Sequence, residues 1–171
     1  MLKQNVRRLT TLGLLIALDV VLTRFFSYML PGNLDRISLQ FLPHSLGGML
    51  FGPIYAAISC IAGDILGMLI NSAGLSFSPL ITLSAGIRGL IYGFILYKKP
   101  VTLLRCIVAA CVVTAVVDLG LNPIWMKIMY GQGYLAILTA KIPVRLIYGP
   151  VAGLVMYPVL KRTSEAIDKK S

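Results

Sequence analysis

Long apolar stretches recur along this sequence, and several of them are long enough to cross a lipid bilayer. A transmembrane helix needs about 20 mostly apolar residues, and residues 53–70 and 79–97 form two such runs. Hydrophobic residues make up 57% of the 171 residues and charged residues only 13%, which is more apolar than a water-soluble core of this size requires. We therefore expect an all-α membrane protein in which residues 1–171 form one compact helical bundle.

The breaks between the apolar stretches divide the chain into about six spans. The turn signals are Leu-Pro-Gly at residues 30–32 and Gly-Pro at residues 52–53. The expected spans cover residues 9–29, 41–51, 53–70, 79–97, 101–130 and 142–160. Loops are expected between them at residues 31–40, 71–78 and 131–141.

The positive charges indicate the orientation of the bundle in the membrane. Lys and Arg are in excess at the cytoplasmic ends of transmembrane segments. With both termini in the cytoplasm, ten of the sixteen cations lie on the inner side, namely Lys3, Arg7, Arg8, Lys98, Lys99, Arg105, Lys161, Arg162, Lys169 and Lys170. Five spans would put one basic cluster outside, so we expect the short 41–51 segment to cross the membrane as well.

Several functional classes are not supported by the sequence. The net charge of +10 does not indicate nucleic-acid binding, because the cations gather at segment ends. Cys60, Cys106 and Cys111 lie in apolar stretches without CxxC spacing, so we interpret them as small core residues. The sequence also has no HExxH motif, nucleophile elbow or GxxxxGK[ST] loop. A protein of this kind that moves a solute against a gradient must take its energy from a partner.

Charged side chains inside the apolar stretches mark the candidate site. A charge in hydrocarbon is costly unless it faces a protein interior or a cavity. At a rise of about 1.5 Å per residue, Asp64 and Arg88 both lie roughly 15 Å from the predicted inner ends of their helices. They share a level, and they form either a structural ion pair or a ligand site. Asp118 and Arg145 are expected to form a second pair nearer the outer face, with a structural or a functional role.

Four other polar or aromatic residues are candidates. Asn122 follows Asp118 by one helical turn, and Trp125 is expected near the outer interface. Asp19 has no evident partner in the sequence, so we interpret it as a neutral acid or as a contact for another subunit. His44 is interpreted as a packing or interface residue rather than a metal ligand.

Small residues spaced four apart predict close helix packing, because they allow helix backbones to approach. Such pairs occur at Gly48/Gly52, Gly63/Gly67, Gly89/Gly93 and Gly149/Gly153. The first helix carries a further small-residue face formed by Gly13, Ala17 and Val21. We interpret this face as a docking surface for another membrane protein.

Four segments of the chain resemble the folate-specific S components of energy-coupling-factor (ECF) vitamin transporters. They are RISLQFLPHSLGGMLFGP at 36–53, GDILG at 63–67, SPLITLSAGIRGLIYG at 78–93 and GLNPIWMKIMYGQG at 120–133. The resemblance covers nearly the whole chain. It implies a bacterial cell-membrane protein that captures folate or a related pterin outside and passes it to a transmembrane subunit and two ATPase subunits. ATP would then be used only by the partner subunits, and no cofactor is expected in this chain.

The resemblance also implies how the protein docks and where its ligand enters. S components dock through two alanines four residues apart on the first helix, and Gly13 and Ala17 stand at those positions. The 31–40 loop is then expected to act as a lid. The loops at 71–78 and 132–141 are expected to complete the outer mouth.

Folate chemistry suits the polar residues already identified. Asp64 is the first candidate for the amino-pyrimidine edge of a pterin, which a carboxylate can bind through paired hydrogen bonds. Arg88 is expected to orient Asp64 or to meet the pterin carbonyl. The other candidates are Asn122 for hydrogen bonding, Trp125 and Phe77 for stacking, and Arg24, Arg36 and Lys141 for the anionic glutamate end.

Three alternatives remain open from the sequence. A channel needs a continuous polar path, but the inner halves of the spans carry almost no polar side chain except Asp19, which favours a cup closed on its inner side. An intramembrane enzyme lacks any catalytic group other than the buried acids. Within the S components, riboflavin or thiamine is the alternative ligand.

Overall fold

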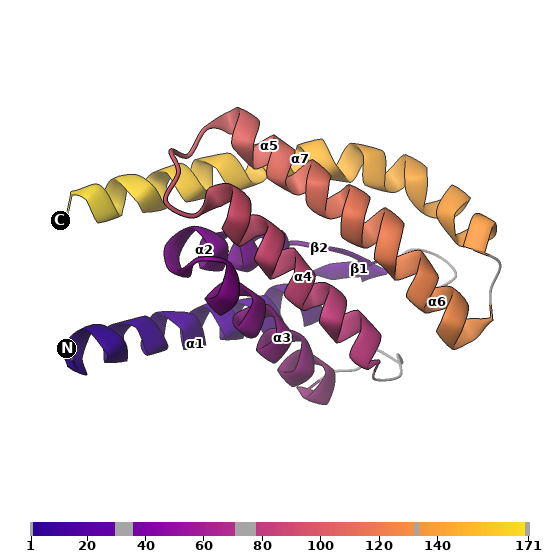
Figure 1. Ribbon diagram of the computed structural model, residues 1–171, viewed down its shortest axis with the longest axis horizontal. Helices are drawn as coiled ribbons and strands as arrows, with labels where there is room; N and C mark the ends of the chain where they lie inside the picture. Colours follow the sequence, from indigo (N-terminus) through magenta and orange to yellow (C-terminus); the bar gives the residue numbers. More distant parts are fainter. Residues whose placement is uncertain (1, 30–35, 71–77, 132–133, 170–171) are drawn as a thin grey trace.

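The computed structural model describes residues 2–29, 36–70, 78–131 and 134–169. Its elements in chain order are α1 (Leu2–Arg24), β1 (Ser27–Met29), β2 (Arg36–Ser38), α2 (Phe41–Phe51), α3 (Pro53–Ile70), α4 (Pro79–Leu96), α5 (Leu103–Val113), the π-helix η2 (Thr114–Leu121), α6 (Asn122–Tyr130) and α7 (Tyr134–Asp168). Figure 1 shows the long helices packed along one another, with both termini at the same end of the bundle.

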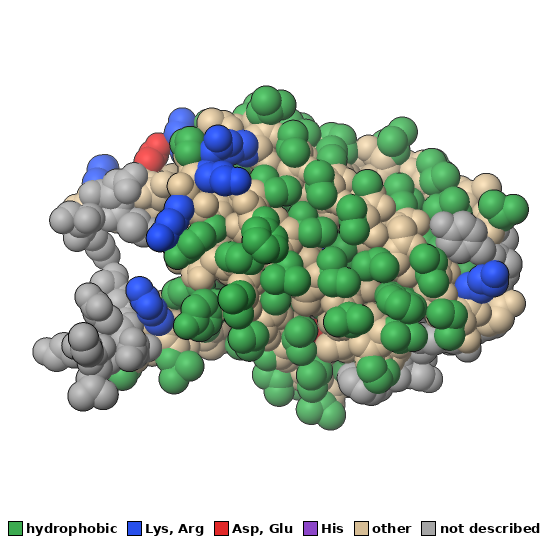
Figure 2. Space-filling model, viewed as in Figure 1, with side chains coloured by type: hydrophobic (Ala, Val, Ile, Leu, Met, Phe, Trp, Pro, Cys, Tyr) green, Lys and Arg blue, Asp and Glu red, His purple; other side chains and the backbone are tan. Residues whose placement is uncertain are grey.

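Four helical segments among the described residues are long and apolar enough to cross a membrane. They are Pro53–Ile70, Pro79–Leu96, Leu103–Ile128 and Ile137–Ala166. The α1 helix has 23 residues but is not in this set. The α2 helix has 11 residues and is therefore about 17 Å long, roughly half the thickness of the hydrocarbon core. Figure 2 shows hydrophobic side chains over most of one face, with most Lys and Arg toward the end that carries the termini.

The predicted break between the second and third spans is confirmed. Gly52 has a φ of +87°, a conformation that glycine adopts without the steric penalty of a side chain. Pro53 is the first residue of α3, where the missing N–H of proline removes no helical hydrogen bond. The chain therefore reverses between α2 and α3 without an intervening loop.

Glycines permit the closest helix contacts, as the small-residue pairs predicted. A Cβ atom on Gly89 would lie 2.7 Å from the carbonyl carbon of Ala56, so α4 packs directly on the α3 backbone. The same close approach to a neighbouring helix is found at Gly48, Gly93 and Gly153. A core of buried residues from α2, α4, α5 and α7 joins these helices and includes Cys106. Cys60 and Cys106 are buried as free thiols, as predicted.

Two short strands replace part of the predicted first span and the following loop. The first helix ends at Arg24, and β1 pairs with β2 in antiparallel register from Ser27–Ser38 to Met29–Arg36. The prediction that the first helix extends to Met29 is therefore wrong. The apolar run continues through residues 25–29, and hydrophobicity alone does not distinguish a short apolar strand from the end of a helix.

The last helix is longer than predicted at both ends. The chain from Tyr134 to Asp168 is one helix of 35 residues, although it contains Pro143, Pro150 and Pro158. The predicted 131–141 loop is wrong from Tyr134 onward, and α6 ends at Tyr130 with Gly131, whose φ is +64°, as its C-cap. Residues 161–168 continue the helix and include the good helix formers Lys161, Arg162, Glu165 and Ala166.

Candidate functional site

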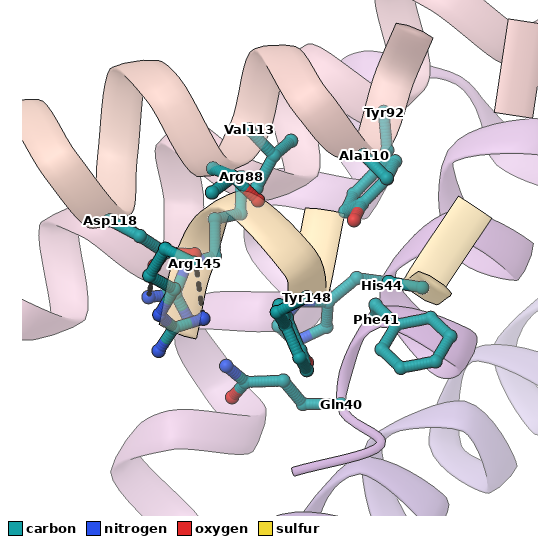
Figure 3. Close-up of a pocket in the computed structure, with 12 residues that line it drawn as sticks. Gln40, Phe41, His44, Arg88, Tyr92, Ala110, Val113, Asp118, Arg145 and Tyr148 are labelled. Atoms are coloured by element: carbon teal, nitrogen blue, oxygen red, sulfur yellow. Dashed lines mark hydrogen bonds and ion pairs between the residues drawn. The ribbon is translucent and has the colours of Figure 1, made fainter. Parts of the chain in front are cut away.

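A narrow cavity lies between α2, α4, α5, η2 and α7 (Figure 3). Its polar and aromatic lining consists of Gln40, Phe41, His44, Arg88, Tyr92, Thr114, Asp118, Arg145 and Tyr148. The enclosed space has room for about one water molecule. A ligand of vitamin size therefore requires the lining side chains or the helices to move apart.

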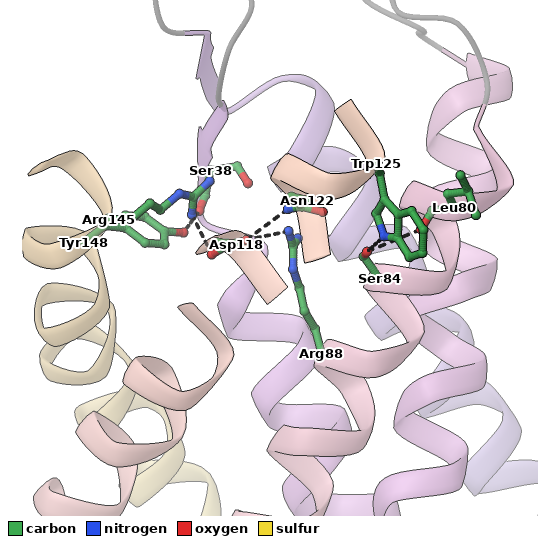
Figure 4. A network of polar contacts seen from close by, with 9 residues as sticks. All are labelled: Ser38, Leu80, Ser84, Arg88, Asp118, Asn122, Trp125, Arg145 and Tyr148. Carbon is green, nitrogen blue, oxygen red and sulfur yellow. Dashed lines mark hydrogen bonds and ion pairs between the residues drawn. The ribbon is translucent and has the colours of Figure 1, made fainter. Parts of the chain in front are cut away.

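Asp118 is the centre of the polar network on one side of this cavity (Figure 4). Arg88 on α4 donates to Asp118 Oδ1 at 2.7 Å, and Arg145 on α7 donates to Oδ2 at 2.9 Å. Asn122 adds a third hydrogen bond to Oδ1 at 3.3 Å. The predicted pair of Asp118 and Arg145 is thus confirmed, and both carboxylate oxygens are occupied. Among the described residues that line the cavity, two guanidinium groups share one carboxylate.

The π-helix η2 positions this carboxylate. Asp118 lies within η2 and is buried. Pro123 lies just after η2 and has no N–H for the carbonyl one turn earlier, which favours a local departure from α-helical geometry. Such π-helical segments are often found at functional sites. The sequence prediction of one regular span over residues 101–130 did not include this feature.

Tyr148 connects α7 to the strand that precedes α2. Its hydroxyl donates to the backbone carbonyl of Ser38 at 2.6 Å. The guanidinium of Arg145 lies over the Tyr148 ring, 4.9 Å from its centroid, in a cation–π contact. Sequence reasoning missed Tyr148, because nothing in the spacing of α7 distinguishes this tyrosine from a residue that faces lipid.

Trp125 lies next to this network without being part of the cavity wall. Its Nε1 donates to Ser84 Oγ on α4 at 2.9 Å (Figure 4). Trp125 therefore contacts α4, and Asn122 contacts the Asp118 carboxylate that also binds Arg88. Ser84 was missed, since a serine in an apolar helix gives no signal of its partner.

A second polar cluster lies between α1, α3 and α4. Thr82 donates to Asp64 Oδ2 at 2.7 Å, and Arg24 approaches Asp64 Oδ1 at 3.8 Å. The Arg24 side chain is 2% exposed and that of Asp64 is 20% exposed. Gly67 allows Arg24 to lie against α3. Among the described residues, Arg24 Nε and Nη1 have no hydrogen-bond partner.

Of the two interpretations of Asp64 and Arg88, a structural ion pair or a ligand site, the ion pair is wrong. Asp64 contacts Arg24 and Thr82, whereas Arg88 contacts Asp118. Thr82 and Arg88 are six residues apart on α4 and therefore point about 120° away from each other around the helix axis. The helical rise gives the depth of a residue along the membrane, but it does not give the face of α4 on which that residue lies.

The expectation that Asp19 lacks a partner is also wrong. His44 Nε2 on α2 lies 3.1 Å from Asp19 Oδ1, and Thr23 donates to the same oxygen at 3.2 Å. His44 is buried, as expected for a packing residue, but it also lines the cavity. No pattern in either segment indicates this contact between α1 and α2.

The remaining candidates have different surroundings. Lys141 is buried in α7. Phe77 lies outside the described residues, and only the backbone of Arg36 is described, in β2. Gly13, Ala17 and Val21 are exposed on α1. No three His, Cys, Asp or Glu side chains in the described part of the chain gather closely enough to hold a metal ion.

The sequence matches one protein family and is similar to several known proteins. Residues 3–165 match the family described as ECF-type riboflavin transporter, S component. The chain is 35% identical over 150 residues to the folate transporter FolT of Clostridium novyi, covering 88% of this chain and 86% of that protein. It is 29% identical over 163 residues to the folate transporter FolT of Leuconostoc mesenteroides, covering 92% and 82%.

Solved structures of other proteins share the fold. The crystal structure of FolT bound with folic acid has a TM-score of 0.81 and 36% identity, and the match covers 90% of this chain and 92% of that one. The structure of an S component of a bacterial ECF transporter has a TM-score of 0.72 and 25% identity, with coverage of 96% and 98%.

Proposed function

This chain belongs to the family of ECF-type riboflavin transporter S components, and from this premise we propose that its own ligand is folate. Members of this family are components of transporters rather than enzymes. In this role the chain captures folate in a pocket that opens outward and delivers it to a transmembrane subunit and two ATPase subunits. ATP is used only by those partners. The folate transporters similar to this chain support folate over the riboflavin of the family's name.

The charge of the cavity is the observation that carries this choice of ligand. Arg88 and Arg145 share the carboxylate of Asp118, so this buried network has an excess of positive charge. A buried excess of charge is unfavourable unless an opposite charge compensates it. Folate is an anion through its glutamate carboxylates, whereas the isoalloxazine and ribityl groups of riboflavin are neutral. The site therefore favours folate.

We assign the two polar clusters to the two ends of the ligand. Asp64 Oδ2 accepts from the neutral hydroxyl of Thr82, and Oδ1 lies 3.8 Å from Arg24, so this carboxylate keeps acceptor capacity for the pterin edge. Both oxygens of Asp118, in contrast, accept from guanidinium groups. Arg88 and Arg145, with Asn122, face the anionic end. The remaining proposed contacts are Trp125 and Phe77 for stacking and Arg36 and Lys141 for the anionic end, whereas Arg24 lies beside Asp64 at the pterin end.

The proposed topology has about six crossings and cytoplasmic termini. Both termini are at the same end of the bundle (Figure 1), and exposed cations gather near that end (Figure 2). In addition to the four apolar segments, α1 and α2 would cross, and α2 would do so where the bilayer is thin or the flanking polar residues reach the interface. We assign the whole chain to one substrate-binding unit of a bacterial cell membrane.

A ligand titration of the purified protein in detergent tests the proposal. Trp125 is the only tryptophan and donates to Ser84 beside the Asp118 network, so bound folate is expected to quench its fluorescence with a stoichiometry of one. Riboflavin and thiamine are expected neither to quench it nor to displace folate. Free N-acetyltryptophanamide at the same absorbance corrects for light absorbed by the ligands.

The outcomes of this titration separate the alternatives. Binding of riboflavin in place of folate would overturn the ligand assignment but not the family. Uptake of folate into liposomes by the chain alone, without partner subunits or ATP, would support a facilitator instead.

Docking through α1 gives a second expected result. Gly13 is exposed, and a Cβ atom on it would have no neighbour within 4 Å, so Gly13→Trp is expected to leave folate affinity within about twofold. The bulky ring would prevent close approach of a partner helix, and ATP-dependent folate uptake is expected to fall by about tenfold or more. Val155→Trp, an exposed position on α7, is the matched control and is expected to retain uptake. Equal loss in both variants would contradict docking at Gly13.

A further inference from the structure

A buried polar contact joins the cavity to α1. His44 on α2 is 4% exposed and Asp19 on α1 is 5% exposed. His44 Nε2 lies 3.1 Å from Asp19 Oδ1, and the second oxygen of Asp19 lies against the backbone of Gly63 on α3. Any side chain at Gly63 would displace this carboxylate. The carboxylate of Asp19 therefore links α1 to both α2 and α3.

The imidazole of His44 is incompletely bonded. Its distance to Asp19 is that of an ion pair, and neither ring nitrogen makes a hydrogen bond of good geometry with the described residues. The thiol of Cys60, a weak hydrogen-bonding group, also lies beside the ring. Buried polar atoms normally have partners. His44 also lines the cavity (Figure 3), so a bound ligand can supply one.

The opposite side of α1 carries the proposed docking residues. Leu15, Asp19 and Thr23 lie on the buried side of this helix, whereas Gly13 and Ala17 are exposed. A shift or rotation of α1 that changes the position of Asp19 also changes the position of the exposed side, because both belong to one helix. The Asp19–His44 contact is a direct connection between the cavity wall and the docking helix.

We propose that His44 is a positioning residue through which a bound ligand fixes α1. This inference rests on the proposed function, since it takes folate as the ligand. A carboxylate beside Nε2 keeps a proton on that nitrogen, which leaves Nδ1 available to a polar group of the ligand. A hydrogen bond between Nδ1 and the ligand turns the ring into line with Asp19. The hydrogen bond to Asp19 then forms, and α1 loses the freedom that the misaligned contact allowed.

Amide hydrogen exchange of the full protein in detergent, with and without saturating folate, tests this link. In the native sequence, folate is expected to slow exchange in residues 15–24 of α1 by about tenfold. Asp19→Asn retains the shape of the side chain and every residue that lines the cavity, so folate still binds. The folate-dependent protection of α1 is expected to disappear in this variant and in His44→Leu. The double variant is expected to lose no more protection than either single one.

Two control variants separate this role from ordinary packing. Leu15→Ala removes a buried apolar contact on the same face of α1, so it is expected to raise exchange equally with and without folate and to retain the difference. Ser45→Ala changes a buried neighbour of His44. The Ser45 hydroxyl donates to the carbonyl of Leu42 on the same helix, so hydrogen exchange in this variant is expected to match the native pattern. If Asp19→Asn does not fold, Thr23→Val, which removes the hydroxyl that donates to Asp19, is expected to weaken the protection by about half.

The outcomes also distinguish this inference from the proposed function. Failure of the native protein to bind folate in a parallel titration would overturn the proposed function. Folate binding without protection of α1, or protection that persists in Asp19→Asn and His44→Leu, would overturn the link through His44 and leave folate binding intact.

Discussion

Asp118→Asn is expected to lower folate affinity by about 100-fold or more. The carboxylate accepts hydrogen bonds from two guanidinium groups, and hydrogen bonds to charged groups contribute about 1.5–3 kcal/mol each. An amide has the same shape but no charge, and its nitrogen would face one of the two cations. Without this carboxylate the two guanidinium groups repel each other and separate, so folate binding must supply the roughly 3 kcal/mol that the two bonds contribute to holding them together. About 1.4 kcal/mol is a factor of ten in affinity. The measurement is the folate dissociation constant of folded, monodisperse protein.

Two further variants make this result interpretable. Glu165→Gln makes the same acid-to-amide change at an exposed site near the end of α7, and its folate affinity is expected to be unchanged. Asp64→Asn tests the pterin assignment separately, with an expected loss of about 10- to 100-fold for one or two charge-assisted bonds. Native affinity in Asp118→Asn would mean that the network only holds α4, η2 and α7 together. Native affinity in Asp64→Asn would reject this residue as the pterin contact.

Gly89→Ala is expected to destabilise the protein by forcing two helix backbones apart. The new Cβ would lie 2.7 Å from both the carbonyl carbon and the oxygen of Ala56, and a backbone cannot rotate away as a side chain can. Overpacking typically costs about 1–3 kcal/mol. Because Arg88 is adjacent in sequence, separation of α4 from α3 also moves the Asp118 network. We expect a lower melting temperature in detergent and weaker folate binding.

Gly13→Ala is the matched control for this change. A Cβ at Gly13 meets no atom within 4 Å, and alanine is the better helix former by about 1 kcal/mol. The melting temperature of this variant is expected to equal or slightly exceed that of the native protein. A Gly89→Ala protein as stable as Gly13→Ala would contradict direct contact between the α3 and α4 backbones.

Helices are predictable from this sequence where Pro and Gly limit them. The bounds of α2, α3 and the start of α4 follow from Gly52, Pro53 and Pro79, which act through local backbone geometry. The predicted end of α1 and start of α7 are wrong, because hydrophobic residues continue across both boundaries. There the choice between helix, strand and loop depends on contacts with distant parts of the chain, which an apolar run does not specify.

The sequence predicts the depth of the site residues in the membrane, but not which residues contact one another. Residues at the same level of a bundle can be identified from the helical rise, and the pairing of Asp118 with Arg145 agrees with such depths. The partner of a buried charge also depends on rotation around each helix axis and on which helices are neighbours. Asp64 and Arg88 share a predicted level but face different helices. The contact of Asp19 with His44 was missed, since the packing of α1 on α2 has no signature in either segment.

The π-helix affects how this site can change during evolution. A π-turn contains more residues than an α-turn, so one residue deleted from Thr114–Leu121 would return the segment to regular α geometry. The π-turn absorbs its extra residue locally, so α6 would keep its orientation, and the change would fall on the side chains of η2 itself, which include Asp118. Relatives that lack one residue at this point are therefore expected to present another side chain of η2 to the ligand, even where the flanking sequence is identical. A change of ligand within this fold can thus arise from a single deletion, without any substitution in the pocket.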